Sequence, residues 1–294
     1  MTIELRHLRA LVALSDEESF TDAARVLGVS QATVSRTIGQ LEHELGATLV
    51  ARTTRAVRLT EAGESFLADA RRTLAALDHA VRSVRGESHA IRIGYAWAAL
   101  GARTTPFLRR WNRENPSTPA RMLRQNTVDS GLLRGLVDVA VVRHRLEDPE
   151  LVSARIGEEP RFAAVAADAP LASRTTVVLA DLATETVGAD PLTGTTSPGL
   201  WTDAGLPSPR VVVTGDVDEW LDLIGAGDIV GVTAAATVAQ YPRPGVVFVP
   251  IVDAPAIPVS AVWHRRFRHP LTDRLVRRLV EAYEDHPAHV GGPA

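Results

Sequence analysis

A tight turn at Gly28 constrains the fold of this chain more than any other feature, because the segments on both sides of it have helical patterns. Before the turn, Ser19 begins a short segment with Asp22 three residues later, which is typical of a helix N-terminus. After the turn, Ser30 is a favourable N-cap for a longer helix. The apolar residues of that helix follow at spacings of 4, 3 and 4: Val34, Ile38, Leu41 and Leu45. The pattern predicts two helices packed across a glycine turn, which is a helix-turn-helix.

The side of the second helix opposite this apolar stripe is small and polar at its N-terminal end. It carries Ala32, Thr33, Ser35 and Arg36. In a helix-turn-helix, the first turns of the second helix meet base edges in the major groove, where small side chains permit close approach. Arginine can then bind guanine or phosphate, and glutamine can pair with adenine. The alternative is a solvated face, because most polar helix faces contact only water.

A basic segment from Leu49 to Thr60 follows and has the pattern of a two-stranded ribbon. Its arginines, Arg52, Arg55 and Arg58, have no acidic residue among them. The whole chain has a formal net charge of -3 at pH 7, so only the placement of charge can favour a phosphate-binding surface. The ribbon therefore predicts a wing that contacts the sugar-phosphate backbone, and it favours DNA binding over a solvated face.

The most regular pattern in the chain is an apolar heptad repeat between Glu61 and Arg85. A helix of this extent would be about 36 Å long. The apolar positions alternate spacings of 3 and 4 and are Leu67, Ala70, Leu74, Leu77, Val81 and Val84. So narrow a seam favours pairing with a second copy of the chain in a homodimer. An amphipathic helix packed on its own domain is the alternative.

These segments together resemble the N-terminal domain of LysR-type transcriptional regulators. The blocks that carry the resemblance lie at 5–8, 19–24, 30–36, 41–46 and 59–63. The resemblance implies contacts with double-stranded operator DNA from Gln31, Thr33, Ser35 and Arg36, and wing contacts from Arg52 and Arg55. It also implies a homotetramer, whereas the heptad seam by itself predicts only a homodimer.

Beyond a polar hinge at 85–89, short apolar strands alternate with helices. Strands are predicted at 91–95, 137–142, 211–213, 229–232 and 259–263, and helices at about 105–114 and 271–283. Such alternation predicts α/β layers with largely parallel sheets. The resemblance is looser here and implies a two-lobed α/β effector domain similar to type 2 periplasmic binding proteins.

The predicted chain is therefore a multidomain protein that combines α+β and α/β parts. A winged helix-turn-helix spans residues 1–60, a linker and dimerisation helix 61–88, and an effector domain 89–294. Within the effector domain, lobe 1 is expected at about 91–160 plus 266–294, and lobe 2 at about 161–265.

Loops at the carboxyl ends of strands are the expected place for a small-molecule effector. The candidates are Trp97, Ala98, Ala99, Leu100, Asn126, Thr127, Arg143, His144, Thr195, Thr196 and Thr233. Ala98 and Ala99 stand where the family often has a hydroxyl, so a carboxylate is not expected to bind through that loop. Arg143 is the alternative source of positive charge, and Trp97 suggests an apolar or aromatic ligand. The alternatives without a binding role are that Trp97 is a core residue and that the threonines form a surface loop.

Other functions find little support in the sequence. With no cysteine, scattered histidines and no nucleophile elbow or phosphate-binding loop, we expect no metal, no cofactor and no catalytic activity. The N-terminal segment has charges among its apolar residues and no apolar run reaches 18 residues, so neither export nor a membrane span is expected. We expect a cytoplasmic transcriptional regulator; the alternative is a solute-binding or enzymatic α/β protein with an incidental helical N-terminus.

Overall fold

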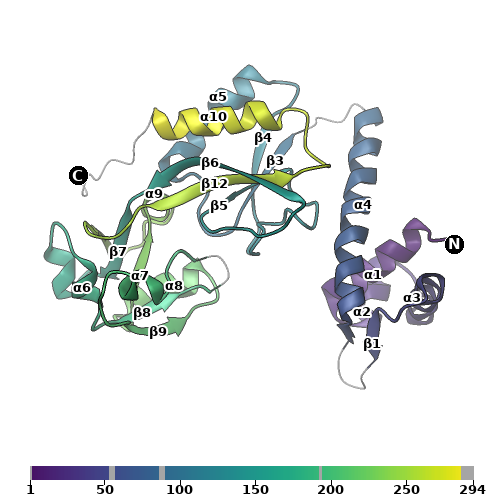
Figure 1. Cartoon of the computed structure of the whole chain (residues 1–294), viewed down its shortest axis with the longest axis horizontal. Helices are drawn as coiled ribbons and strands as arrows, with labels where there is room; N and C mark the ends of the chain where they lie inside the picture. The colour runs from purple at the N-terminus through teal and green to yellow at the C-terminus, as the bar shows by residue number, and fades with distance from the viewer. Residues whose placement is uncertain (1, 53–56, 86–89, 192–193, 286–294) are drawn as a thin grey trace. The chain divides into compact units, whose positions relative to one another are not determined.

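The computed structural model describes residues 2–52, 57–85, 90–191 and 194–285 (Figure 1). The chain folds into two compact units, the first built mainly from residues 1–87 and the second mainly from residues 88–294. None of the described helices is both long and apolar enough to span a membrane. Each unit contains its own buried apolar core, so each has its own source of stability.

The first unit has three short helices, a two-stranded ribbon and one long helix. Ser19 caps the second helix by accepting the N–H of Asp22 at 3.3 Å, and Ser30 caps the third by accepting the N–H of Thr33 at 3.2 Å. Gly28, with a φ of 66°, ends the second helix in the left-handed conformation that favours glycine. The elements are α1 (Leu5–Glu17), α2 (Phe20–Leu27), α3 (Gln31–Leu45), β1 (Val50–Arg52), β2 (Val57–Leu59) and α4 (Glu61–Arg85). The predicted helix-turn-helix, ribbon and long helix are confirmed.

The apolar stripe of α3 forms the centre of this unit. Ile38 and Leu41 are fully buried and pack in one cluster with Leu11 and Leu14 of α1. Each such side chain contributes about 1.5–3 kcal/mol relative to leaving it exposed. Leu67 of α4 belongs to the same cluster, so the N-terminal part of the long helix is fixed to its own unit.

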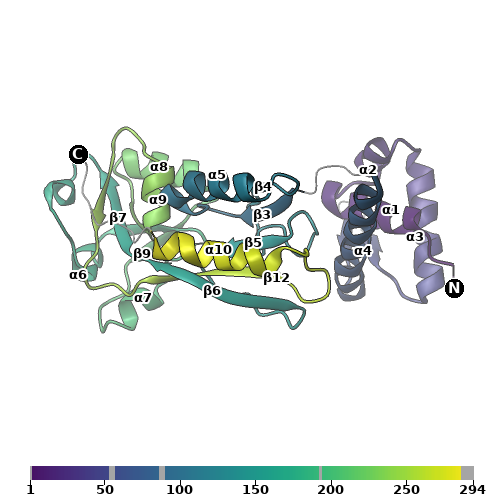
Figure 2. The ribbon, with the colours of Figure 1, turned by 90° about the horizontal axis from the view of Figure 1, so that it is seen from above.

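The second unit contains two five-stranded sheets, and the first is covered on one face by two helices. Its strand order is β4 (Ala120–Arg124), β3 (Ile91–Tyr95), β5 (Val139–Val142), β12 (Ile257–His264) and β6 (Leu151–Glu159). The short helix η1 (Gly101–Arg103) leads into α5 (Thr104–Glu114), which lies beside α10 (Thr272–Glu284) over the sheet (Figures 1 and 2). Trp111 and Leu275 from these helices share one core with the strand residues Ile93 and Val141.

The second sheet is packed on both faces. Its strand order is β11 (Val246–Pro250), β7 (Arg161–Ala166), β10 (Val230–Ala234), β8 (Thr186–Ala189) and β9 (Arg210–Val213). Side chains alternate along β7, so Ala163 and Val165 enter one core while Ala164 enters another. The remaining helices of the unit are η2 (Pro170–Ser173), α6 (Leu179–Leu182), α7 (Gly199–Thr202), α8 (Val217–Gly225) and α9 (Ala235–Gln240).

Both sheets are mixed, which differs from the largely parallel arrangement expected. In the first sheet, β3 pairs in parallel with β4 and β5, but β12 is antiparallel to β5 and β6. In the second, β8 is parallel to β9 and β10, but β7 is antiparallel to β10 and β11. The antiparallel strands β6, β7, β11 and β12 flank the two connections between the sheets. Local hydrophobicity does not report which sheet a crossing strand will join.

The position of the second connection corrects the expected lobe boundary. The chain leaves the first sheet after Glu159 and enters the second at Arg161. It returns between Pro250 and Ile257, because β12 pairs with β5 and β6, and not near residue 265 as expected. Residues 257–265 therefore belong with lobe 1.

Two helical glycines give a matched test of the packing in the first unit. A Cβ on Gly63 would lie 2.1 Å from the carbonyl oxygen of Leu49, whereas a Cβ on Gly39 would meet nothing within 4 Å. We expect Gly63→Ala to destabilise the unit by about 1–3 kcal/mol, because backbone must move. Gly39→Ala should stabilise α3 by about 0.5–1 kcal/mol. Hydrogen exchange of the α1–α4 amides measures both, and equal protection in the two variants would contradict this packing.

Candidate nucleic-acid interface and ligand cavity

The first turns of α3 present an exposed polar surface. Gln31, Thr33 and Arg36 are exposed, and Ser35 is half-buried. The Thr33 hydroxyl lies 2.8 Å from the Ser30 hydroxyl, so Thr33 also takes part in the N-cap. The structure therefore places the four predicted α3 residues together on the part of the helix that its own core leaves uncovered.

The wing is fixed to the end of α3 by a carboxylate. Glu42 accepts the backbone N–H groups of Leu49 and Val50 at 2.8 and 3.0 Å, at the start of β1. In the antiparallel ribbon, Arg58 is exposed and lies opposite Ala51. The backbone of Arg52 belongs to β1, but its side chain and the whole of Arg55 lie outside the described residues.

The heptad positions of α4 fall into two groups. Leu67 and Ala70 are 3% and 1% exposed within one chain, so they pack on their own unit and are not available for the predicted dimer seam. The reason is that the first turns of α4 lie on α1, whose apolar side they cover. Leu74 and Leu77 are half-buried, and Val81 and Val84 are 39% and 90% exposed. The single heptad repeat in the sequence therefore corresponds to two surfaces in the structure. Its first positions pack within the unit, and its last positions form an exposed apolar surface.

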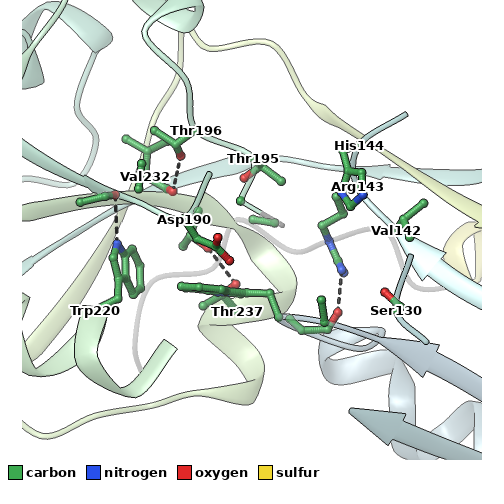
Figure 3. Close-up of a pocket in the computed structure, with 18 of the residues that line it drawn as sticks. Ser130, Val142, Arg143, His144, Asp190, Thr195, Thr196, Trp220, Val232 and Thr237 are labelled. Carbon is green, nitrogen blue, oxygen red and sulfur yellow. Dashed lines mark hydrogen bonds between the residues drawn. The ribbon is translucent and has the colours of Figure 1, made fainter. Parts of the chain in front are cut away.

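A cavity that opens to solvent lies between the two sheets of the second unit (Figure 3), and its empty space, with the solvent-facing part included, is about 560 Å³. Seven of the predicted residues line it: Trp97, Ala98, Arg143, His144, Thr195, Thr196 and Thr233. Four do not: Ala99, Leu100, Asn126 and Thr127. Leu100 is fully buried in the core of the first sheet, and Asn126 donates its side-chain N–H to the carbonyl of Gly215 instead.

Arg143 lines the cavity, but its charge is already compensated. Its guanidinium donates to both carboxylate oxygens of Glu159, at 3.0 and 2.9 Å, and to the carbonyls of Ala98 and Ala99, at 2.6 and 2.8 Å. Burial alone would lower the pKa of Arg143, but Glu159 raises that pKa above its ordinary value. The expectation that Arg143 would supply charge to an effector is therefore wrong, because its partner is built into the fold.

Glu159 is fully buried and makes further contacts. It accepts the hydroxyl of Tyr283 at 2.7 Å and the backbone N–H of Ala236 at 3.3 Å. Burial would raise the pKa of this carboxyl, but Arg143 and these hydrogen bonds hold the pKa below its ordinary value. The guanidinium of Arg103 lies 4.4 Å from the centre of the Tyr283 ring and completes the buried group.

The sequence prediction missed Ser130, Asp190, Trp220 and Thr237, which also line the cavity. Asp190 directly follows the last residue of the parallel strand β8. Because ligands bind at the carboxyl ends of parallel strands, this position could have identified Asp190 as a candidate from the sequence. Trp220 lies inside α8 and had no such signal. It approaches the cavity because Gly188 and Gly231 lack side chains: a Cβ on Gly231 would lie 2.0 Å from the Trp220 ring.

The loop after β3 connects the two lobes. The indole of Trp97 meets that of Trp220 edge to face, with ring centres 5.6 Å apart. Tyr241 donates its hydroxyl to the carbonyl of Trp97 at 2.8 Å, and the N–H of Ala99 donates to the side chain of Gln240 at 2.9 Å. Any ligand that moves this loop will change contacts between the lobes.

The sequence matches two family descriptions. One is "LysR substrate binding domain", over residues 85–284, and the other is "Bacterial regulatory helix-turn-helix protein, lysR family", over residues 5–64. Within the described residues, no group of three or more His, Asp or Glu side chains is placed to hold a metal ion.

Two curated relatives and one solved protein are similar to this chain over most of its length. The chain is 38% identical to the uncharacterized HTH-type transcriptional regulator YnfL of Escherichia coli, over 76% of this chain and 79% of that protein. It is 30% identical to the regulator BudR of Raoultella terrigena, over 96% and 100%. The LysR family regulator CbnR is 27% identical, with a TM-score of 0.68 over 96% of this chain and 99% of that one. CbnR has also been solved with its target DNA, and that structure matches with a TM-score of 0.66, 27% identity, and coverage of 95% and 100%.

The buried Glu159 gives a sharp stability test. Glu159→Gln leaves Arg143 buried without its counter-charge, and we expect a loss of about 3–5 kcal/mol in the second unit. Urea unfolding followed by tryptophan fluorescence measures this, because every tryptophan lies between residues 97 and 263. Since the Glu159 pKa is lowered by folding, this stabilisation is present above the ordinary glutamate pKa and is lost as the pH falls through the lower, folded value.

The matched control is Glu158→Gln, one residue earlier. Glu158 is exposed and pairs with Arg155, also exposed, so the change should cost well under about 1 kcal/mol. Similar losses in the two variants would contradict a special role for the buried carboxylate.

Proposed function

The chain belongs to the LysR family of bacterial transcriptional regulators, and from this premise we propose how its parts divide the work. It is a DNA-binding regulator whose second unit is an effector-binding domain. We propose that residues 1–60 bind operator DNA, that 61–88 form the linker helix, and that 89–294 bind the effector. We propose that lobe 2 covers about 161–256, because β12 pairs with β5 and β6 of the first sheet.

The exposed first turns of α3 support the assignment of the DNA-reading residues. Gln31, Thr33, Ser35 and Arg36 lie on the uncovered part of a helix whose opposite side is buried, as insertion into a major groove requires. Arg52 and Arg55 are proposed as wing contacts because they belong to an acid-free basic ribbon; both are proposed from the sequence alone.

The exposed end of α4 supports a homodimer. Val81 and Val84 continue the heptad positions of Leu74 and Leu77 but are exposed in one chain, and Val84 is 90% exposed. Two such helices would bury these side chains against each other and bring two DNA-binding units together on paired half-sites. A homotetramer, which the family resemblance implies, is proposed as the larger assembly.

The cavity of the second unit is the proposed effector site. It is lined by both lobes, and Trp97 lines it while also contacting Trp220 and Tyr241 of the second lobe. A ligand that binds one arrangement of the lobes more tightly shifts the population toward that arrangement. We propose that this shift alters how the subunits hold operator DNA.

The same cavity supports a binding role and not a catalytic one. An active-site serine needs a hydrogen-bonded base, but Ser130 Oγ and His144 Nδ1 are both buried without a hydrogen-bond partner. We propose that the protein has no enzymatic activity of its own and acts in the cytoplasm, where its DNA lies.

Arg36→Ala tests the reading helix. Operator fragments are first selected from the source genome by binding to the protein, and their affinity is then measured by gel shift at several salt concentrations. We expect a loss of about tenfold or more with relaxed preference at one base position, because an arginine-to-guanine contact specifies sequence. Arg9→Ala, an exposed arginine of α1, is the control and should keep the affinity. Unchanged operator binding by Arg36→Ala would remove this residue from the interface.

Val84→Asp tests the dimer seam. Because Val84 is exposed in one chain, the change should leave the fold intact by circular dichroism, yet place two carboxylates in the seam of the homodimer. We expect light scattering to give a lower mass than for the unaltered protein. Thr73→Asp introduces the same charge at an exposed α4 position outside the heptad repeat and should keep the mass. An unchanged mass for Val84→Asp would exclude this part of α4 as the main interface.

A further inference from the structure

Several hydrogen-bond donors in the cavity wall are occupied by protein oxygens. The indole N–H of Trp220 and the hydroxyls of two threonines each donate to a neighbouring protein oxygen, as the dashed lines in Figure 3 show. These bonds are Trp220 Nε1 to the Gly188 carbonyl at 3.2 Å, Thr196 Oγ1 to the Val232 carbonyl at 2.7 Å, and Thr233 Oγ1 to Thr237 Oγ1 at 2.7 Å. A ligand that needs donors from the wall, such as a carboxylate, cannot use these three and is left with hydroxyls such as those of Ser130 and Thr237.

The guanidinium of Arg143, the cation in the cavity wall, also makes its hydrogen bonds to protein groups. Arg143 uses four of its five N–H bonds on Glu159, Ala98 and Ala99, and the charge of Glu159 cancels its own. A second buried guanidinium, Arg161, donates to the carbonyls of Thr195 and Pro255 and does not line the cavity. Burial lowers the pKa of Arg161 to about 10, so its guanidinium stays charged at neutral pH, but it is not part of the cavity lining.

Several atoms that can accept hydrogen bonds also belong to residues that line the cavity, and one of them, the Ser130 hydroxyl, can donate as well. Ser130 is 1% exposed, and its hydroxyl has no hydrogen-bond partner. His144 Nε2 lies 2.8 Å from the carbonyl of Val128, which can only accept, so in the neutral ring the buried and unpartnered Nδ1 is an acceptor. Asp190 adds a carboxylate, which can accept about four hydrogen bonds and so can serve a ligand in addition to protein groups.

Two indoles complete this chemistry. Trp97 and Trp220 both line the cavity and contact each other edge to face. Indole attracts cations more strongly than the other aromatic side chains do, and it also packs against flat apolar groups. The described wall thus combines acceptors, one carboxylate that Arg143 does not neutralise, and aromatic surface.

We infer that the effector is a small organic cation, an amine or amidine whose N–H groups donate to Asp190, Ser130 and His144 while its apolar part packs against Trp97 and Trp220. The inference rests on the proposed function, because it takes this cavity as the effector site. An Arg143 free of Glu159 would have selected an anionic ligand, whereas this inference assigns a positive charge to the ligand.

Pairs of compounds that share a skeleton and differ in charge test the inference. Binding of benzylamine, benzamidine and tryptamine to the full-length protein is compared by calorimetry and thermal shift with that of benzoate, phenylacetate and indole-3-acetate. We expect binding by at least one amine or amidine and by none of the carboxylates. Asp190→Asn should weaken that binding about tenfold or more, since a charge-assisted hydrogen bond is lost.

Asp203→Asn, at an exposed position at the end of α7, is the matched control and should change the affinity by less than about twofold. Ser130→Ala removes a single oxygen and gives a second variant in case Asp190→Asn folds poorly; it should weaken binding about fivefold. Binding of a carboxylate, or amine binding that both of these cavity variants leave unchanged, would overturn the inference. So would the absence of any binding by the amines and the amidine.

Operator gel shifts on the same samples separate this inference from the proposed function. Retained operator binding with failure of every amine and amidine would overturn the ligand class and leave the DNA-binding role standing. Loss of operator binding by the unaltered protein would instead count against the proposed function itself.

Discussion

The second unit depends on the buried contact between Arg143 and Glu159. Glu159 is the last residue of β6, immediately before the chain crosses to the other sheet, and Arg143 follows the last residue of β5. Through these two side chains, the crossover is connected to the loop at Ala98 and Ala99, to α10 through Tyr283, and to the start of α9 through Ala236. Segments that are far apart in the sequence thereby acquire a shared, well-defined position.

This contact also determines the chemistry of the cavity. A buried ion pair adds little stability compared with an apolar pair, but it fixes geometry, because neither charge can be left alone in a buried site. Here the geometry removes a cation from the ligand-binding wall. Asp190 then becomes the lining charge that Arg143 does not offset, and the polarity of the site follows from a residue, Glu159, that does not line the cavity.

In the first unit, the apolar patterns of α3 and α4 each lead to a buried surface and an exposed surface on the same helix. The buried stripe of α3 holds the helix on α1, and this leaves Gln31 and Arg36 exposed at its first turns. The heptad repeat of α4 begins as a contact with its own unit at Leu67 and ends as an exposed apolar surface at Val84. A helix that is fixed at one end and exposed at the other suits a connection between a DNA-binding unit and a second copy of the chain.

The sequence by itself determined the features that arise within short segments: the glycine turn before α3, the ribbon, the heptad repeat and half of the strands of the second unit. Periodicity reports these because each depends on neighbours within a few turns of the chain. Only the tertiary structure decided that β12 returns to the first sheet, that Trp220 reaches the cavity beside Gly231, and that Glu159 compensates Arg143. These depend on pairs of residues that the sequence separates, and a charge or an aromatic ring acquires its role only when its partner in space is known.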